Sequence, residues 1–397
     1  MIDNPDNWSY YSEMNINNPS IDYQMKIVLK RGSGTNDPTK GIIYDGGNCY
    51  YDDMRDERIG TESDPSTAEQ LPQWTESVTS GIERIVWTKT NGNSVLYIFI
   101  GNSGVDEYSN ADTVFDYFNH WTSDDTGNWK YTNTGNNHRH WWYKNNTFDN
   151  YKEWRVVALF KSWVAGSWDN SEFAFTPDNT SAWYNVDHVA LYFEHRTSKG
   201  ADSNHLFTKL DLKNEGTAYT TNLKSCDKPA VDTKLLIRLC YAADRVYYEI
   251  YDLDNNTQLL SDEITNTSQI PPTSDTKYLC WQAWDVGGGI FSYLPPTYLD
   301  LGNKSSNGGM ELNVDYWFLK KYSSIEPSFS PVNWGVWQEI SPPAPPSKNL
   351  SDIDVTPARV ITTDFPAAAG LPKNQKIRIY AKAVSGQEVE KILDELT

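Results

Sequence analysis

Four oxygen-bearing residues near a predicted turn follow the spacing of a calcium-binding loop. Asp252, Asp254 and Asn256 take its first, third and fifth positions, and Glu263 takes its twelfth. Carboxylate and amide oxygens at these positions coordinate Ca²⁺ in loops of that length. Thr257 replaces the turn glycine at the sixth position and the flanks read as strands, so a plain hairpin turn is the alternative. Calcium is the one cofactor that the sequence suggests.

Aromatic residues in the middle of the chain are the candidates for sugar binding, because the flat apolar face of a ring can stack on a pyranose. Aromatics make up 14% of the 397 residues, and 16 of them are Trp. Such a surplus allows both core rings and exposed rings. The glycan-binding candidates are Trp141, Trp142, Tyr143, Trp281 and Trp284.

Hydrolysis of a glycosidic bond would need two carboxyl groups about 5 to 9.5 Å apart. Glu311 and Asp315 lie four positions apart on one predicted strand, which separates them by roughly 13 Å. Glu249 and Asp252 are three positions apart and fall on opposite faces of a strand. Carboxylates from different strands could still converge. A secreted polysaccharide-active glycoside hydrolase is therefore the alternative to a binding protein.

Short apolar runs, rich in β-branched and aromatic residues and bounded by Gly, Asn and Asp, predict the elements that position these residues. Examples are residues 95–100, 154–160 and 246–251. Trp74 and Trp87 stand beside alternating polar residues and are predicted to fill a sandwich core, with ligand contact as the alternative. The pattern predicts an all-β fold of two antiparallel sandwiches, residues 1–118 and 119–325.

An ordered series of short motifs runs through the first 118 residues. It comprises Asp22–Ile27, Asp52–Asp56, Leu71–Glu76, Val86–Lys89, Tyr97–Asn102 and Ser109–Phe118. In that order and spacing, the motifs resemble a domain family of unknown function that recurs in archaeal and bacterial cell-surface proteins. Its members commonly precede a concanavalin A-like (laminin-G-like) sandwich. The resemblance implies a jelly-roll of that kind for residues 119–325 and an archaeal cell surface as the setting, and it implies no reaction.

The last part of the chain differs in character. Residues 326–348 include the run Ser341–Ser347, rich in proline, and are predicted to form a stiff linker. Residues 349–397 then form a small β/α tail, with strands predicted at 359–362 and 376–382 and an amphipathic helix at 387–396. This tail is too short for a large core of its own. We expect it to anchor or assemble the protein by docking on the same chain or on another copy.

The formal charge of −19 and the pI near 4.7 argue against nucleic acid and anionic membranes as partners. No apolar stretch approaches the length of a membrane span, and the N-terminus does not resemble a signal peptide. We therefore expect a protein without membrane insertion, numbered from its mature start or carried outside by another route.

These observations predict a non-catalytic structural or adhesion protein of an extracellular surface or a virus particle. It would recognise glycans or partner proteins with its lectin-like sandwich. Its tail would bind other copies of itself, or particle or filament subunits. The sequence names neither the ligand nor the symmetry of such an assembly.

Overall fold

The computed structural model describes the backbone of residues 1–120, 128–134, 137–145, 152–166, 170–176, 186–272, 278–285, 299–301, 309–340, 378–382 and 388–392. Side chains are described for residues 1–118, 153–166, 172–176, 186–272, 310 and 312–340. The chain divides into two compact units, Met1–Pro342 and Pro343–Thr397. Each unit is described by itself below.

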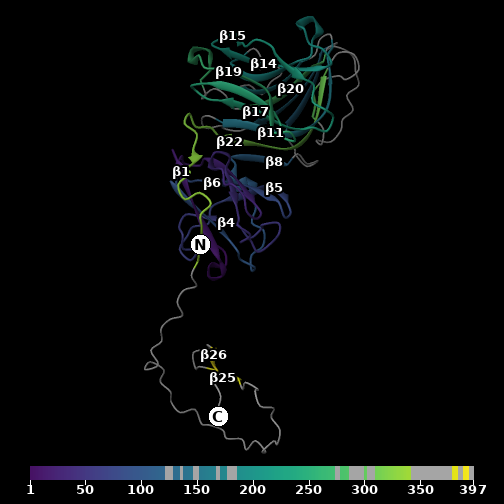
Figure 1. Ribbon diagram of the computed structural model, residues 1–397. Coiled ribbons are helices and arrows are strands. Elements are labelled where there is room, and N and C mark those ends of the chain that lie inside the picture. The colour runs from purple at the N-terminus through teal and green to yellow at the C-terminus, as the bar shows by residue number, and fades with distance from the viewer. Residues whose placement is uncertain are drawn as a thin grey trace, which may run out of the picture. The chain divides into compact units, whose positions relative to one another are not determined.

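The first sandwich packs a five-stranded sheet, counted over the described residues, against a four-stranded one (Figure 1). The five-stranded sheet has the order β23-β1-β7-β4, with β24 also paired to β1, and the four-stranded sheet has the order β3-β2-β6-β5. Apolar side chains at alternate positions of both sheets meet in one core, which includes Met14, Ile27 and Ile98. The strands are β1 (Tyr10–Asn17), β2 (Gln24–Lys30), β3 (Ile42–Tyr44), β4 (Arg58–Gly60), β5 (Gln73–Thr79), β6 (Glu83–Lys89), β7 (Val95–Ile100), β23 (Ser328–Phe329) and β24 (Trp337–Glu339).

The second sandwich is larger and packs a seven-stranded sheet against an eight-stranded one within the described residues. The seven-stranded sheet has the order β19-β18-β17-β11-β22-β21, with β8 also paired to β22. Its strands are β8 (Tyr117–His120), β11 (Lys152–Val164), β17 (Lys234–Tyr241), β18 (Val246–Asp252), β19 (Thr257–Ile264), β21 (Leu299–Leu301) and β22 (Gly309–Lys321).

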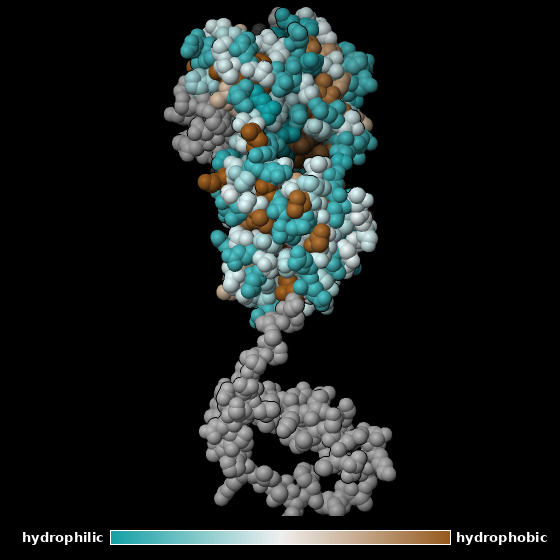
Figure 2. All heavy atoms as spheres, turned by 60° about the vertical axis from the view of Figure 1, so that its left-hand side comes forward, coloured by the Kyte–Doolittle hydropathy of each residue, from teal (hydrophilic) through white to brown (hydrophobic). Residues whose placement is uncertain are grey.

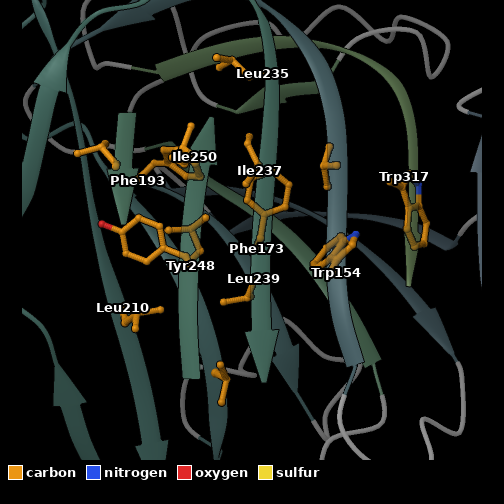
Figure 3. Close-up of a cluster of buried hydrophobic side chains, with 14 of the residues drawn as sticks. Trp154, Phe173, Phe193, Leu210, Leu235, Ile237, Leu239, Tyr248, Ile250 and Trp317 are labelled. Atoms are coloured by element: carbon orange, nitrogen blue, oxygen red, sulfur yellow. The ribbon is translucent and has the colours of Figure 1, made fainter. Parts of the chain in front are cut away.

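The eight-stranded sheet has the order β15-β14-β13-β12-β20-β10-β9, with β16 also paired to β14. Rings fill the core between the two sheets, where Trp154 packs edge to face on Phe173 and on Trp317 (Figure 3). The strands of this sheet are β9 (Asn128–Thr134), β10 (Asn137–Asn145), β12 (Asn170–Thr176), β13 (His188–Glu194), β14 (His205–Asn214), β15 (Thr217–Thr220), β16 (Lys224–Asp227) and β20 (Tyr278–Asp285).

Helical structure in the described residues is limited to single turns. These are α1 (Ala111–Val114), η1 (Pro5–Asn7), η2 (Pro38–Lys40), η4 (Thr197–Lys199) and η5 (Thr267–Gln269). Almost all of the strand pairs are antiparallel, an exception being β2 with β3. The predicted antiparallel all-β fold is confirmed.

The two sandwiches share a third apolar core, which we call the junction core. It contains Trp74, Trp87, Ala111, Val114, Phe115, Val157, Tyr316 and Phe318. On β6, Val86 faces the first sandwich core whereas Trp87 faces the junction core. On β22, Trp317 faces the core of the second sandwich whereas Phe318 faces the junction core. Because successive side chains of a strand point to opposite faces, each of these sheets is buried on both sides there. The four sheets therefore lie as successive layers (Figure 1).

The junction core corrects one sequence interpretation. Trp74 and Trp87 are buried, as expected, but they lie outside the core of the first sandwich. Trp74 packs edge to face on Tyr316, whose hydroxyl donates to a Glu76 carboxylate oxygen at 2.5 Å. The alternation of the sequence had shown that one face of each strand is apolar, but it could not show which sheet covers that face.

Residues 323–340, which we call the strap, correct the predicted linker 326–348. After β22 the chain returns to the first sandwich, where β23 and β24 pair with β1. Phe329 and Trp334 join the first core, and Trp334 donates its indole N–H to the Ile42 carbonyl at 2.7 Å. Burial of these rings fixes the strap on the first sandwich, so residues 326–340 do not act as a linker. Residues 341–348 lie outside the described residues.

The described part of the second unit is a two-stranded antiparallel sheet of β25 (Arg378–Lys382) and β26 (Glu388–Ile392). The strand predicted at 376–382 agrees with β25. The helix predicted at 387–396 is wrong for residues 388–392, which form β26. The β-branched Val389 and Ile392 favour a strand, and this preference prevails over the helical spacing of the apolar residues. The strand predicted at 359–362 lies outside the described residues.

None of the helices in the described part of the chain has the length and apolar character of a membrane span. Figure 2 shows a mostly hydrophilic face of the first unit, with apolar residues in separate small patches.

Candidate functional site

The outer face of the seven-stranded sheet is apolar where the junction core covers it and polar beside that core. The ladder brings Lys320 of β22, Glu153 of β11, Cys240 of β17, Tyr247 of β18 and Glu263 of β19 into one row across five strands. Directly opposed residues of antiparallel strands share a face. The row therefore crosses the face that the junction core covers only in part.

An open groove of about 500 Å³ lies on this face, beside the first sandwich and the start of the strap. Residues from β17, β18, β19, the β17–β18 turn and the strap line it. The lining side chains that could contact a ligand through polar groups or rings include Arg238, Arg245, Tyr247, Glu249, Glu263 and Glu326.

A fully buried carboxylate, Glu153, organises the groove from below. Arg238 donates to it from Nε at 2.8 Å and from Nη2 at 3.0 Å, and Tyr247 donates from its hydroxyl at 3.3 Å. Arg155 forms a further ion pair with it. Burial alone would raise the pKa of Glu153, but Arg155 and Arg238 outweigh burial and hold that pKa well below its usual value. Glu153 is thus an ionised anchor and not a proton donor.

Arg238 is held on every side. Besides Glu153, its guanidinium donates to Glu249 and, from Nη2, to the Tyr247 hydroxyl at 3.1 Å. Two opposed carboxylates fix the plane of a guanidinium, because its N–H groups form a rigid fork. The groove therefore presents Arg238, Tyr247 and Glu249 in one arrangement before any ligand binds.

Arg245 and Glu263 supply the hydrogen-bonding groups of the groove that are open to a ligand. Arg245 donates from Nε to the Tyr322 hydroxyl at 2.5 Å, and its guanidinium carbon lies 5.3 Å from the ring centres of both Tyr247 and Tyr322. Among the described residues, neither Nη of Arg245 nor the carboxylate of Glu263 has a protein partner. One donor group and one acceptor group thus remain for a ligand beside two tyrosine rings.

Charged side chains also mark the outer face of the eight-stranded sheet. Glu194 receives hydrogen bonds from Nε and Nη2 of Arg196, both at 2.6 Å, and Arg196 also donates to the Tyr192 hydroxyl at 3.1 Å. Lys209 lies 4.4 Å over the Tyr192 ring. Because both oxygens of Glu194 accept from one guanidinium, this carboxylate is committed to an ion pair and is poorly suited to shuttle a proton.

The predicted ring residues lie on neighbouring strands of that eight-stranded sheet. Trp141, Trp142 and Tyr143 belong to β10, and the register pairs Trp142 with Trp281 of β20 and Arg139 with Trp284. On its other side β20 pairs Trp281 with Phe173 and Trp284 with Asn170. The backbone thus brings the two predicted groups together. Their side chains lie outside the described residues, so sugar contact by these rings stays a prediction.

The four predicted calcium ligands are not brought to one place. Asp252 ends β18, and Asp254 and Asn256 follow in the turn before β19, whereas Glu263 pairs with Tyr247 at the far end of the hairpin. Asp252 accepts from the backbone and side-chain N–H groups of Asn255 at 3.0 and 2.8 Å.

Asp254 also has a partner, since it accepts from the Lys234 backbone N–H at 2.8 Å. These contacts are those of a hairpin turn. No group of three or more His, Cys, Asp or Glu residues in the described part of the chain is arranged to hold a metal. Calcium stays a prediction for the three turn residues.

Most groove residues were missed by the sequence interpretation, although a signal existed. Of those that line the groove, Glu263 was considered only as a calcium ligand and Glu249 only as a hydrolytic carboxylate. Glu153, Arg155, Arg238 and Lys320 are charged residues inside otherwise apolar strand runs. Such residues mark a strand face that is polar but not solvated. The sequence could not show that the three strands β11, β17 and β22 place these charges side by side.

Comparison with known proteins adds family context for a minor part of the chain. Residues 53–133 match the family described as "Domain of unknown function (DUF2341)". The match begins in the loop before β4 and ends within β9, so it covers part of the first sandwich and enters the second. It overlaps the predicted family region from residue 53 onward. No curated protein matches this chain.

Solved structures similar to the chain include three sandwich proteins. The exoplasmic/lumenal domain of VIP36 in its metal-free form has 12% identity and a TM-score of 0.34, over 56% of this chain and 89% of that one. A legume lectin-like domain from Entamoeba histolytica has 12% identity and a TM-score of 0.30, over 50% and 88%. A Bacillus licheniformis β-glucanase has 12% identity and a TM-score of 0.33, over 52% and 98%. Likeness at this level carries no conclusion about ligand or activity.

Proposed function

We propose that this protein is a non-catalytic glycan-binding protein and that the groove on the seven-stranded sheet holds the sugar. The observation that carries the proposal is the fixed set of Arg238, Tyr247 and Glu249. Beside this set lie the Nη groups of Arg245 and the carboxylate of Glu263, which have no partner among the described residues. Sugars present closely spaced hydroxyls that both donate and accept. A groove with carboxylate acceptors, guanidinium donors and a ring edge matches that chemistry.

The charge arrangement supports binding over hydrolysis. A glycosidase needs one protonated and one ionised carboxyl on either side of the scissile bond. Glu153 is ionised under two guanidinium groups, and Glu249 is paired with Arg238. These carboxylates are committed to structural ion pairs, which fix donors and acceptors in place and so reduce the entropy lost on binding.

The wider role in this proposal is that of a structural or adhesion protein at the outer surface of an archaeal cell or of a virus particle. The motif series in the first 118 residues supports that setting, through the cell-surface family that it resembles. In the same proposal residues 349–397 assemble the protein with other copies or with filament or particle subunits. Within the described residues of this tail, a single two-stranded sheet is found, and a hairpin of that size is marginal in water unless it packs on a partner.

A glycan array followed by isothermal titration tests the binding function. The wild-type protein should retain a defined set of oligosaccharides, and Glu263→Gln should bind them about tenfold more weakly, because a hydrogen bond to a charged group contributes about 1.5 to 3 kcal/mol. Glu69→Gln is the matched control. It removes the same charge from an exposed site of the first sandwich and should bind like the wild type. Absence of glycan binding, or equal affinity in the Glu263 variant, would contradict the proposal.

A further inference from the structure

A chain of buried polar contacts joins the first sandwich to the groove. Tyr23, which is 2% exposed and precedes β2, accepts a hydrogen bond from Lys320 Nζ on β22 at 2.5 Å. The same Nζ lies 4.1 Å from the centre of the Tyr23 ring. Lys320 is itself 4% exposed. The first sandwich thus fixes the position of a lysine that belongs to the second.

From Lys320 the contacts reach the groove by two routes. Its Nζ lies 3.8 Å from a carboxylate oxygen of Glu326, which lines the groove from the strap. Lys320 also stands opposite Glu153 in the β11–β22 ladder, and Glu153 holds Arg238 and Tyr247. The positive charge of Lys320 therefore acts on one groove residue directly and on two more through Glu153.

A second contact ties the same two elements together. The side-chain amide of Gln24 donates to the Val114 carbonyl at 3.0 Å and accepts from the Lys321 backbone N–H at 2.8 Å. Gln24 directly follows Tyr23, and Lys321 directly follows Lys320. The backbone around both members of the pair is thus fixed, so the Tyr23–Lys320 contact is built into the junction.

We propose that Tyr23 and Lys320 are positioning residues for the groove, through which the first sandwich sets the arrangement of Glu326, Glu153, Arg238 and Tyr247. The first sandwich then serves the binding site without touching the ligand. This inference deepens the proposed function, and its structural part is testable without any glycan.

The groups that face Lys320 determine how pH acts on this series of contacts. They are Tyr23 from the first sandwich, Glu326 from the strap, Glu153 and Arg155 from β11, and Arg238 from β17. Burial lowers the pKa of Lys320 to about 8, although Glu153 and Glu326 oppose that effect. The positive charge of Lys320 is therefore present at pH 7 and is largely lost by pH 9.

Carbon NMR of protein labelled at arginine ¹³Cζ tests the proposal, with Arg238 assigned by Arg238→Lys. In the wild type the Arg238 signal should shift with a midpoint near pH 8. In Lys320→Arg, which keeps its charge at all accessible pH values, the signal should stay at its low-pH position. In Tyr23→Phe the midpoint should move below that of the wild type, because a hydroxyl that accepts from the charged lysine is gone. Tyr11→Phe, which removes a Tyr hydroxyl bonded to Gln338, should keep the wild-type midpoint.

A wild-type Arg238 signal without a transition between pH 6 and 10 would overturn the proposal, as would the same transition in Lys320→Arg. Melting temperatures of all variants identify any that fail to fold, and Lys320→Arg and Tyr23→Phe provide independent readings. Glycans found on the array should bind the wild type roughly fivefold or more weakly at pH 9 than at pH 7, and Lys320→Arg nearly equally at both. If no glycan binds, the proposed function fails while the NMR result still decides the positioning role.

Discussion

Trp87 of the first sandwich meets Phe318 of the second edge to face, with ring centres 5.5 Å apart. Arg155 completes the contact, because its guanidinium carbon lies 5.1 Å from the Trp87 ring centre. The apolar junction core and the charged face beside it are therefore continuous. We therefore expect two sandwiches packed in this way to behave as one body.

The junction should make the two sandwiches unfold together. Phe318→Ala removes a ring that is 1% exposed and should cost about 3 to 5 kcal/mol, the range for truncating a buried Phe. Calorimetry of the wild type should show one transition for residues 1–340, and the variant should show a lower first transition separated from a second. Val231→Ala, at an exposed site, is the control and should change little. Two separate transitions in the wild type would show that the junction does not couple the sandwiches.

The strap should be part of the first sandwich. A chain ending at Pro342 keeps β23 and β24 and should melt close to the full-length protein. A chain ending at Glu326 loses both strands together with Phe329 and Trp334, so the first core is left with cavities that cost more than about 3 kcal/mol. Urea unfolding followed by circular dichroism distinguishes the two. Equal stability of the two truncated chains would mean that the strap only rests on the surface.

The same Pro342 truncation tests the assembly role of the tail. Full-length protein should form oligomers or filaments at high concentration, and the truncated chain should stay monomeric in light scattering while both sandwiches remain folded. The physical reason is that a short β segment buries its apolar side only against a partner. A strictly monomeric full-length protein would refute assembly through the tail.

The ring residues of β10 and β20 belong to the other sheet and need their own test. Trp284→Ala should weaken glycan binding while leaving the melting temperature nearly unchanged. Trp142 stands in register with Trp281, which pairs with the core residue Phe173, so Trp142→Ala should instead cost stability. Phe173→Ala, a known core position, sets the scale for a core ring. A loss of about 3 to 5 kcal/mol in Trp284→Ala would instead assign that ring to the core.

Strand runs and the sandwich class could be predicted from sequence because alternation reports the number of buried faces on each strand. The partner of a face could not be predicted. Trp87 on β6 and Phe318 on β22 have the same local pattern as residues facing a sandwich core, and their contact joins segments far apart in the chain. The strands β23 and β24 span only two and three residues, too few to show an alternation, so their return to β1 left little signal. The groove was missed because the register of three strands is what brings Glu153, Arg238 and Lys320 together.

Glu153 should make stability depend on acid. Its folded pKa lies well below the usual carboxyl value, so the folded state binds fewer protons than the unfolded state between the two pKa values. The stabilisation is therefore present above the unfolded pKa and is lost as pH falls toward the folded one. Glu153→Gln leaves Arg155 and Arg238 without their shared anion and should cost about 3 to 5 kcal/mol at pH 7. Urea unfolding at pH 7 and pH 3 should show this difference shrinking in acid, with Glu69→Gln as the exposed control. A difference between Glu153→Gln and the wild type that is the same at both pH values would mean that the Glu153 charge does not stabilise the folded state.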